Sequence, residues 1–182
     1  FFFKQKTAYE IPKRDWSSDV CSSDLSFRRG LRAATSRDLS KVNSMKYHHK
    51  AFVRWDDLDA MGHVNNAIYL TYAQEARFEW SFRQHHARGE RPGILEMVVA
   101  RAEVDFLAPI FEGGIFVDVT LWVDKIGNSS FGMIYEVRKG ETLCARIKTV
   151  QVAVDESVAK SRPLDDGERK FLESYLIPSE EK

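Results

Sequence analysis

The feature of this 182-residue chain that most constrains its fold is one stretch, Val64–Gln84, which contains neither glycine nor proline. The stretch is long enough for a helix of about six turns. Its apolar residues point in nearly every direction around such a helix, and a helix of that kind is buried rather than lying on a surface. We therefore expect a single long helix that packs against most of the remaining elements.

The segments around this helix have the patterns of β-strands. Val98–Phe106 alternates cleanly between apolar and polar residues, as a half-buried strand does. Three further strands are expected at 115–126, 130–139 and 142–154, and one before the helix at 50–57, with Ala51, Val53 and Trp55 on one face. A short amphipathic helix is expected at Asp165–Leu176.

The turns between the last four strands are short, and short turns join strands that pair antiparallel. A helix covered by such a sheet is an α+β architecture. The sequence therefore predicts one buried helix wrapped by an antiparallel five-stranded sheet.

The composition restricts the possible partners. The chain is 43% hydrophobic and 12% aromatic, as in ordinary globular proteins. No stretch approaches the ~18 consecutive apolar residues that a membrane span needs. Residues 45–182 carry 18 basic and 22 acidic side chains, whereas nucleic-acid binders present a clustered basic face. We expect neither a membrane nor a nucleic acid as partner.

The first 44 residues differ from the rest of the chain. Residues 1–25 have no helical or strand period and resemble the translation of a sequencing-library adapter, although a disordered natural tail is an alternative. Residues 26–44 are rich in Arg and Ser; we expect untranslated upstream sequence or a loose tail there, with a transit peptide as the alternative. We expect 1–44 to be a non-native or disordered leader, with the functional domain at 45–182. That domain has a single cysteine, Cys144, which fits a reducing, cytoplasmic location.

Polar residues are concentrated where the first strand meets the helix, in Trp55–Tyr69. The start of a helix offers unpaired backbone N–H groups and a positive dipole end, which stabilise a developing oxyanion. Gly62 lets the backbone approach a ligand closely, and Asp59 can place a carboxylate beside that position. Such a carboxylate can attack a carbonyl or deprotonate the water that does. The alternative for Asp57 and Asp59 is hydrogen bonding within a turn.

The segment Val53–Trp80, VRWDDLDAMGHVNNAIYLTYAQEARFEW, resembles the signature of hotdog-fold thioesterases of the 4-hydroxybenzoyl-CoA type. It is also similar to the DLD and HVNN motif of acyl-carrier-protein thioesterases. The resemblance extends in element order over Tyr47–Asp155. It implies a hotdog fold and hydrolysis of acyl-CoA or acyl-carrier-protein thioesters without a cofactor. It also implies a homodimer or tetramer in which each active site is built across the interface.

The resemblance assigns roles to individual residues. Asp59 matches the catalytic carboxylate, and Asn66 matches the residue whose backbone N–H binds the oxyanion. His63 matches the histidine of the carrier-protein group and is our third candidate catalytic residue. Met61 stands where that group has an asparagine, which argues against a carrier-protein substrate.

Further residues are expected to assist. We predict that Gly62, Val64, Asn65 and Tyr69 contact the substrate. The helix residue Glu75 is a candidate secondary base, the alternative being a structural role or a place at a dimer interface. No metal site is expected, because adjacent histidine pairs diverge on any regular element and lack nearby cysteines. The alternative to an enzyme is a hotdog protein that binds acyl thioesters without cleaving them; a hotdog dehydratase ranks third.

Overall fold

The computed structural model describes residues 45–87, 89, 94, 96–155, 157 and 160–178. All of them belong to one compact unit, Lys41–Lys182. The leader expected at 1–44 lies outside the described residues, so its nature stays a prediction.

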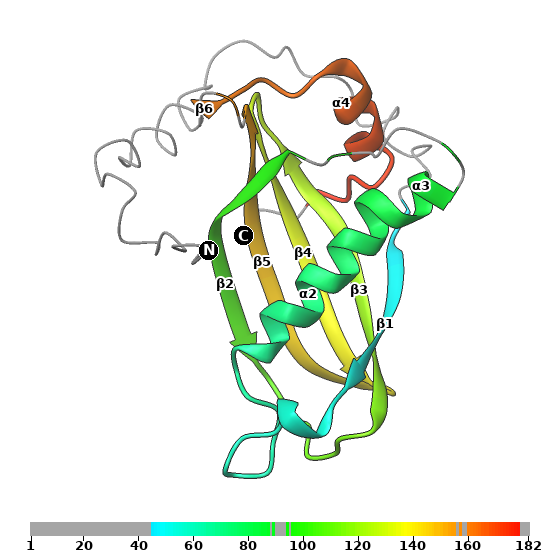
Figure 1. Ribbon diagram of the computed structural model, residues 1–182, viewed down its shortest axis with the longest axis vertical. Coiled ribbons are helices and arrows are strands. Elements are labelled where there is room, and N and C mark those ends of the chain that lie inside the picture. Colours follow the sequence, from blue (N-terminus) through cyan, green and yellow to red (C-terminus); the bar gives the residue numbers. More distant parts are fainter. Residues whose placement is uncertain are drawn as a thin grey trace, which may run out of the picture. The chain divides into compact units, whose positions relative to one another are not determined.

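Five antiparallel strands form one sheet in the order β1-β3-β4-β5-β2 (Figure 1). Their bounds are β1 Tyr47–Val53, β2 Met97–Phe106, β3 Ile115–Ile126, β4 Ser130–Lys139 and β5 Thr142–Asp155. The predicted five-stranded antiparallel sheet is confirmed, but the expected pairing of β2 with the next strand, β3, is wrong: β2 pairs with β5, because the connection at 107–114 is long enough to cross the sheet. A two-residue strand, β6 (Lys160–Ser161), adds to β5 and was not predicted.

The first strand is displaced from its predicted position. It ends at Val53, and the next residues form a 3₁₀ turn, η3 (Trp55–Asp57). The prediction that Trp55 shares the buried face of Ala51 and Val53 is wrong, because the turn rotates its side chain outward and leaves it 77% exposed. The ring lies against the backbone of Gly113, where an added Cβ would come within 3.2 Å of the indole.

The long helix begins four residues later than predicted. It consists of α2 (Ile68–Phe78), a π-helical turn η4 (Glu79–Arg83) and α3 (Gln84–Ala87). Residues 64–67 are not helical, because the side chain of Asn65 accepts a hydrogen bond from the Ala67 N–H and holds a turn there (2.9 Å). Asparagine commonly stabilises such turns at the expense of helix.

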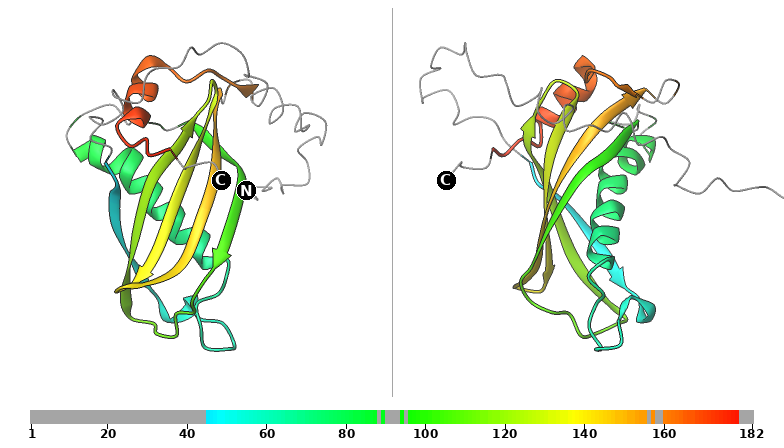
Figure 2. Two further views of the ribbon diagram at one scale, coloured as in Figure 1. Left: turned by 180° about the vertical axis from the view of Figure 1, so that it is seen from behind. Right: turned by 90° about the vertical axis from the view of Figure 1, so that its left-hand side faces the viewer.

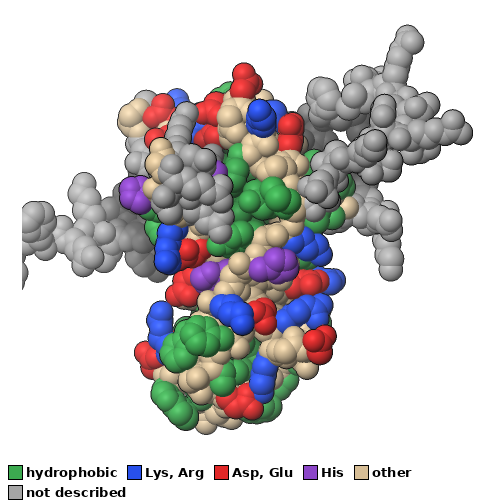
Figure 3. All heavy atoms as spheres, turned by 90° about the vertical axis from the view of Figure 1, so that its right-hand side faces the viewer, with side chains coloured by type: hydrophobic (Ala, Val, Ile, Leu, Met, Phe, Trp, Pro, Cys, Tyr) green, Lys and Arg blue, Asp and Glu red, His purple; other side chains and the backbone are tan. Residues whose placement is uncertain are grey.

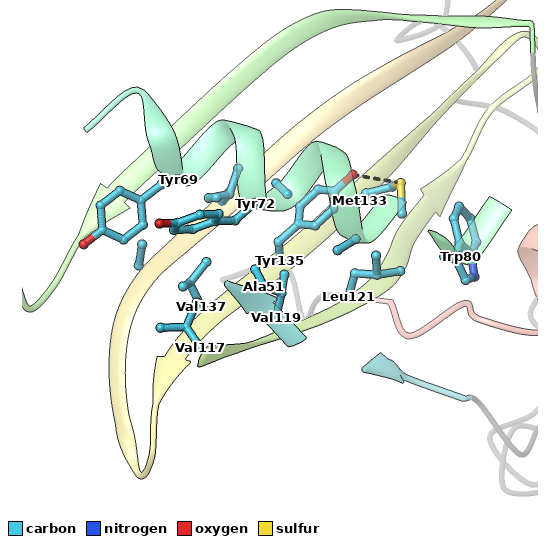
Figure 4. Packing of buried hydrophobic residues seen from close by; sticks show 14 of the residues in the cluster. Ala51, Tyr69, Tyr72, Trp80, Val117, Val119, Leu121, Met133, Tyr135 and Val137 are labelled. Carbon is cyan, nitrogen blue, oxygen red and sulfur yellow. Dashed lines mark hydrogen bonds between the residues drawn. The ribbon is translucent and has the colours of Figure 1, made fainter. Parts of the chain in front are cut away.

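The helix crosses one face of the curved sheet, as the right-hand view in Figure 2 shows. Its inner residues Tyr72, Ala73 and Ala76 are 0–2% exposed, whereas Phe78, on the outer side, is 53% exposed. The expectation of burial on all sides therefore holds for one face only, because a single sheet layer covers a single face. In Figure 4 the ring of Tyr72 projects from the helix over buried side chains of β3 and β4, such as Val137.

The C-terminal helix α4 (Asp166–Glu173) closes one end of the sheet. Its first turn is capped by Asp165 and Glu168, which bond each other's backbone N–H groups at 2.7 and 2.9 Å. Glu168 is only 4% exposed and accepts two hydrogen bonds from Arg162 at 2.7 and 2.8 Å. Phe171 packs against Trp80 of the central helix, with ring centroids 4.7 Å apart.

The surface differs between the two edges of the sheet. On the side shown in Figure 3, acidic and basic side chains are mixed, and hydrophobic atoms gather near the lower end. At the opposite edge, β2 has no strand beyond it among the described residues, and Val99 and Phe106 are 44% and 52% exposed. None of the described helices is long and apolar enough to cross a membrane.

Candidate active site

The loop before α2 is a tight hairpin. Leu58 and Val64 form an antiparallel bridge, and between them the Asp59 N–H donates to the His63 carbonyl at 2.9 Å. The Gly62 N–H donates to the Asp59 carbonyl, also at 2.9 Å. Gly62 has φ of 77°, a conformation that glycine adopts without steric cost. This geometry puts Asp59 and His63 opposite each other on the hairpin.

Their side chains interact. The Asp59 Oδ2 atom lies 3.2 Å from His63 Nδ1, and Asp59 Oδ1 accepts a hydrogen bond from the Met61 N–H at 2.8 Å. The two side chains are 25% and 32% exposed. An imidazole that donates from Nδ1 to a carboxylate keeps Nε2 as an acceptor. The pair can therefore act as a base through the carboxylate or through the ring.

A second turn, Asn65–Ile68, begins the helix. The Asn65 N–H donates to the carbonyl of Asp57 at 2.9 Å, and the Ile68 N–H donates to the carbonyl of Asn65 at 3.0 Å. With the side-chain bond to Ala67, these contacts fix Asn65 on three sides. Asn65 thus holds the turn in place, and its side chain is directed at the backbone.

The backbone N–H of Asn66 takes no part in the hydrogen bonds of this turn. It has no hydrogen-bond acceptor among the residues that the structure describes. It belongs to the same trans peptide unit as the Asn65 carbonyl and points the opposite way, so the Ile68–Asn65 bond also fixes its direction. An oriented, unpaired N–H at a helix start is a suitable donor to an oxyanion.

A cavity of about 330 Å³ opens at this corner, where the start of α2 lies beside the end of β2 (Figure 1). Five of the predicted site residues line it: Asp59, His63, Val64, Asn66 and Tyr69. Four lining residues were not predicted: Phe106, Leu107, Ala108 and Pro109. They come from the end of β2 and the loop after it, which lie more than 35 residues along the chain. The one local signal was the proline that ends the strand pattern.

The remaining candidates lie elsewhere. Gly62 and Asn65 are exposed and do not line the cavity, so their substrate contacts stay predictions. Glu75 is also outside the lining; its Oε1 atom pairs with Arg54 at 3.3 Å. This ion pair joins the Glu75 carboxylate to Arg54, the residue that follows β1, and gives Glu75 a structural contact.

Tyr69 forms the inner wall of the cavity. It is 2% exposed, and its ring lies edge-on to Phe106, with centroids 5.4 Å apart. Burial raises the pKa of Tyr69 to about 12, and the nearby Cys144 adds to the rise. The phenol is therefore protonated at neutral pH. Figure 4 shows its ring projecting from the first turn of α2, next to Tyr72.

No group of three or more His, Cys, Asp or Glu side chains within the described residues is arranged to hold a metal ion. Cys144 is a free, buried cysteine. The polar residues that line the cavity are thus Asp59, His63, Asn66 and Tyr69.

Comparison with known proteins identifies the family of the chain. Residues 53–172 match the Thioesterase-like superfamily. The chain belongs to this superfamily. Its fold is the hotdog fold of the solved thioesterase structures, as the sequence resemblance implied.

Among curated proteins, a 1,4-dihydroxy-2-naphthoyl-CoA hydrolase from Nostoc punctiforme is 31% identical over 134 residues, which is 71% of this chain and 88% of the relative. Among solved structures, a thioesterase from Thermus thermophilus in complex with coenzyme A and Zn is 31% identical, with a TM-score of 0.58 over 70% of this chain and 92% of that one. A 1,4-dihydroxy-2-naphthoyl-CoA thioesterase from Synechocystis, at 23% identity, shares the fold with a TM-score of 0.58. The match covers 70% of this chain and 96% of that one.

Proposed function

We propose that this member of the thioesterase-like superfamily hydrolyses thioesters of coenzyme A at the cavity beside the start of α2. The observation that carries the proposal is that one cavity is lined by both Asp59 and Asn66, and the Asn66 N–H has no acceptor among the described residues. A carboxylate supplies the base or nucleophile, and the N–H supplies the oxyanion donor. Together they are what the cleavage of a carbonyl–sulfur bond needs.

In the reaction, Asp59 takes a proton from a water molecule as that water attacks the thioester carbonyl carbon. The negative charge that develops on the carbonyl oxygen is stabilised by the Asn66 N–H and the positive end of α2. The carbon–sulfur bond then breaks, the thiolate takes up the proton, and the products are a carboxylic acid and free coenzyme A. In the nucleophilic variant, Asp59 attacks first and water hydrolyses the resulting anhydride.

The contact between Asp59 and His63 gives the proton a second route. With Nδ1 held by the carboxylate, Nε2 of His63 can act as the base while Asp59 orients the ring. We assign the base to Asp59, as the resemblance implies, and give His63 a supporting role. Separate replacement of the two residues distinguishes the routes.

For the acyl group, an aromatic acid is the first choice. The cavity is walled by the rings of Tyr69 and Phe106, which suit the flat face of an aromatic acyl group. Two relatives, at 31% and 29% identity, are named 1,4-dihydroxy-2-naphthoyl-CoA hydrolase. We therefore propose 1,4-dihydroxy-2-naphthoyl-CoA as the first compound to test.

The test is a panel of aromatic and aliphatic acyl-CoA thioesters incubated with the protein and a thiol reagent. The expected result is catalytic release of free thiol, fastest with an aromatic acyl-CoA. The same acyl group on carrier protein should be cleaved more slowly, since Met61 departs from the carrier-protein motif. Absence of thiol release from every member of the panel would refute the proposal.

One observation favours a second function, the binding of acyl thioesters without hydrolysis. Asp59 Oδ1 accepts a hydrogen bond from the Met61 N–H, which is how an aspartate acts when it only stabilises a turn. A binding protein of this kind would take up acyl-CoA stoichiometrically in calorimetry and release no thiol. The same panel therefore separates the two functions.

We further propose that the functional domain is 45–182, acting in the cytoplasm as a homodimer or tetramer. A protein that begins at Met45 is expected to keep the melting temperature and turnover of the full chain. The exposed apolar residues of edge strand β2, such as Val99, favour pairing of this edge with a second copy.

A further inference from the structure

The carboxylate of Asp57 is buried at the base of the loop that carries the active-site groups. The residue is 5% exposed, and burial of a carboxylate is unfavourable unless its oxygens accept hydrogen bonds. Its Oδ2 atom accepts two, from the Arg54 backbone N–H and from the Tyr72 hydroxyl, each at 2.8 Å. The guanidinium of Arg54 is directed to Glu75 instead. Tyr72 is thus the side chain that holds this carboxylate.

The backbone of Asp57 holds the turn that presents the oxyanion donor. Its carbonyl accepts the Asn65 N–H at 2.9 Å, and the Asn65 carbonyl accepts the Ile68 N–H at 3.0 Å. The Asn66 N–H takes its direction from that same peptide unit. A displacement of Asp57 would therefore be passed through its hydrogen bond to the Asn65 N–H and then through the backbone of Asn65 to the peptide unit that carries the donor.

Tyr72 lies on the helix that begins at this turn, one turn after Ile68. Its hydroxyl closes a ring of contacts that runs from Asp57 to Asn65, to Ile68, along the helix and back to Asp57. The ring of Tyr72 is 2% exposed, packs edge-on against Tyr69 with centroids 6.3 Å apart, and does not line the cavity. Burial, and next the hydrogen bond to Asp57, raise the pKa of Tyr72, so the phenol stays a donor at neutral pH.

We propose that Tyr72 is a positioning residue that fixes the Asn66 oxyanion donor through the buried carboxylate of Asp57. The inference rests on the proposed thioester hydrolysis and names a residue that acts on it without touching substrate. An error of about 1 Å in the placement of a catalytic group can reduce turnover by about a hundredfold. Loss of the Tyr72 hydroxyl is therefore expected to reduce turnover more than it affects binding.

The test is Tyr72→Phe, which removes one oxygen and keeps the buried ring. The matched control is Tyr135→Phe. Tyr135 is also fully buried beneath the helix, but its hydroxyl bonds Met133 and Arg77, away from the turn. We expect Tyr72→Phe to reduce kcat roughly ten- to a hundredfold, with KM unchanged within about twofold. Tyr135→Phe should leave both constants close to those of the wild type even where it lowers the melting temperature.

A second readout follows the turn without catalysis. Amide hydrogen exchange at Asn65, whose N–H bonds the Asp57 carbonyl, should be faster in Tyr72→Phe than in the wild type and unchanged in Tyr135→Phe. Equal kcat in the wild type and Tyr72→Phe would overturn this inference and leave the proposed function standing. The same kcat loss in both variants would also overturn it, since that result would report lost stability. Absence of turnover in the wild type would overturn the proposed function and this inference with it.

Discussion

Replacement of Asn66 by proline isolates the backbone N–H assigned to the oxyanion. The Ile68 N–H donates to the Asn65 carbonyl, so Asn65 to Ile68 form a β-turn with Asn66 at its second position. Asparagine at the first position and proline at the second are both favoured in type I turns. The Asn66 N–H has no acceptor within the described part of the chain, so proline removes no native hydrogen bond. The substitution deletes a donor and leaves the turn intact.

The expected effect follows from these contacts. Loss of one oxyanion donor reduces kcat by about 10²–10³, or about 2.7–4 kcal/mol of transition-state stabilisation. Stability should be unchanged or rise by up to ~1 kcal/mol, because proline restricts the unfolded chain. The control is Asn66→Ala, which keeps the N–H and removes only the side chain, and which should keep most of the turnover.

The assay compares kcat for the best acyl-CoA of the panel, with urea denaturation of each variant as the stability measurement. The reasoning would be refuted by an Asn66→Pro protein that folds with wild-type stability and turns over at the wild-type rate. It would also be refuted by Asn66→Ala losing as much activity as Asn66→Pro, since the side chain would then be the functional group.

Three further predictions concern stability and assembly. Gly132→Ala should destabilise the fold by about 1–3 kcal/mol in urea denaturation, because the new methyl would overlap the Asp124 carboxylate. Adding Asp124→Ala to the same protein should restore part of the lost stability. The hydrogen bonds from Arg162 lower the pKa of Glu168 below its unfolded value of about 4.3, so its stabilisation is complete above that pH and lost as the pH falls further. The melting temperature should therefore fall less between pH 5 and 3 in Glu168→Gln than in the wild type. Light scattering at micromolar concentration should show a dimer or tetramer that Val99→Lys, on edge strand β2, shifts toward monomer; a fully active wild-type monomer would contradict this.

The strands could be predicted from the sequence because their signal is local. Alternation of apolar and polar residues at 98–106 and short turns after Ile126 and Lys139 place strands β2 to β5 within a few residues of their bounds. The start of the helix was misplaced because the side chain of Asn65 competes with helical hydrogen bonding, which periodicity does not register. Trp55 was misplaced because one 3₁₀ turn changes the face on which a residue lies.

The two walls of the candidate site also differ in whether the sequence alone could predict them. The near wall, from Asp59 to Tyr69, is one continuous segment and could be proposed from residue types and the family resemblance. The far wall, from Phe106 to Pro109, depends on β2 lying next to β5, a pairing between distant parts of the chain. The bond from Tyr72 to Asp57 joins residues 15 positions apart across a turn, and its geometry emerges only when the helix start is known.

The measurement that tests the central claim most directly is the turnover of Asp59→Asn on the best acyl-CoA of the panel. The substitution keeps the size and one oxygen of the side chain and removes its charge. We expect kcat to fall by ~10²–10⁴, the usual contribution of a general base, with little change in KM. Near-normal turnover of Asp59→Asn, with activity abolished in His63→Ala or Glu75→Gln, would contradict the account and move the base to one of those residues.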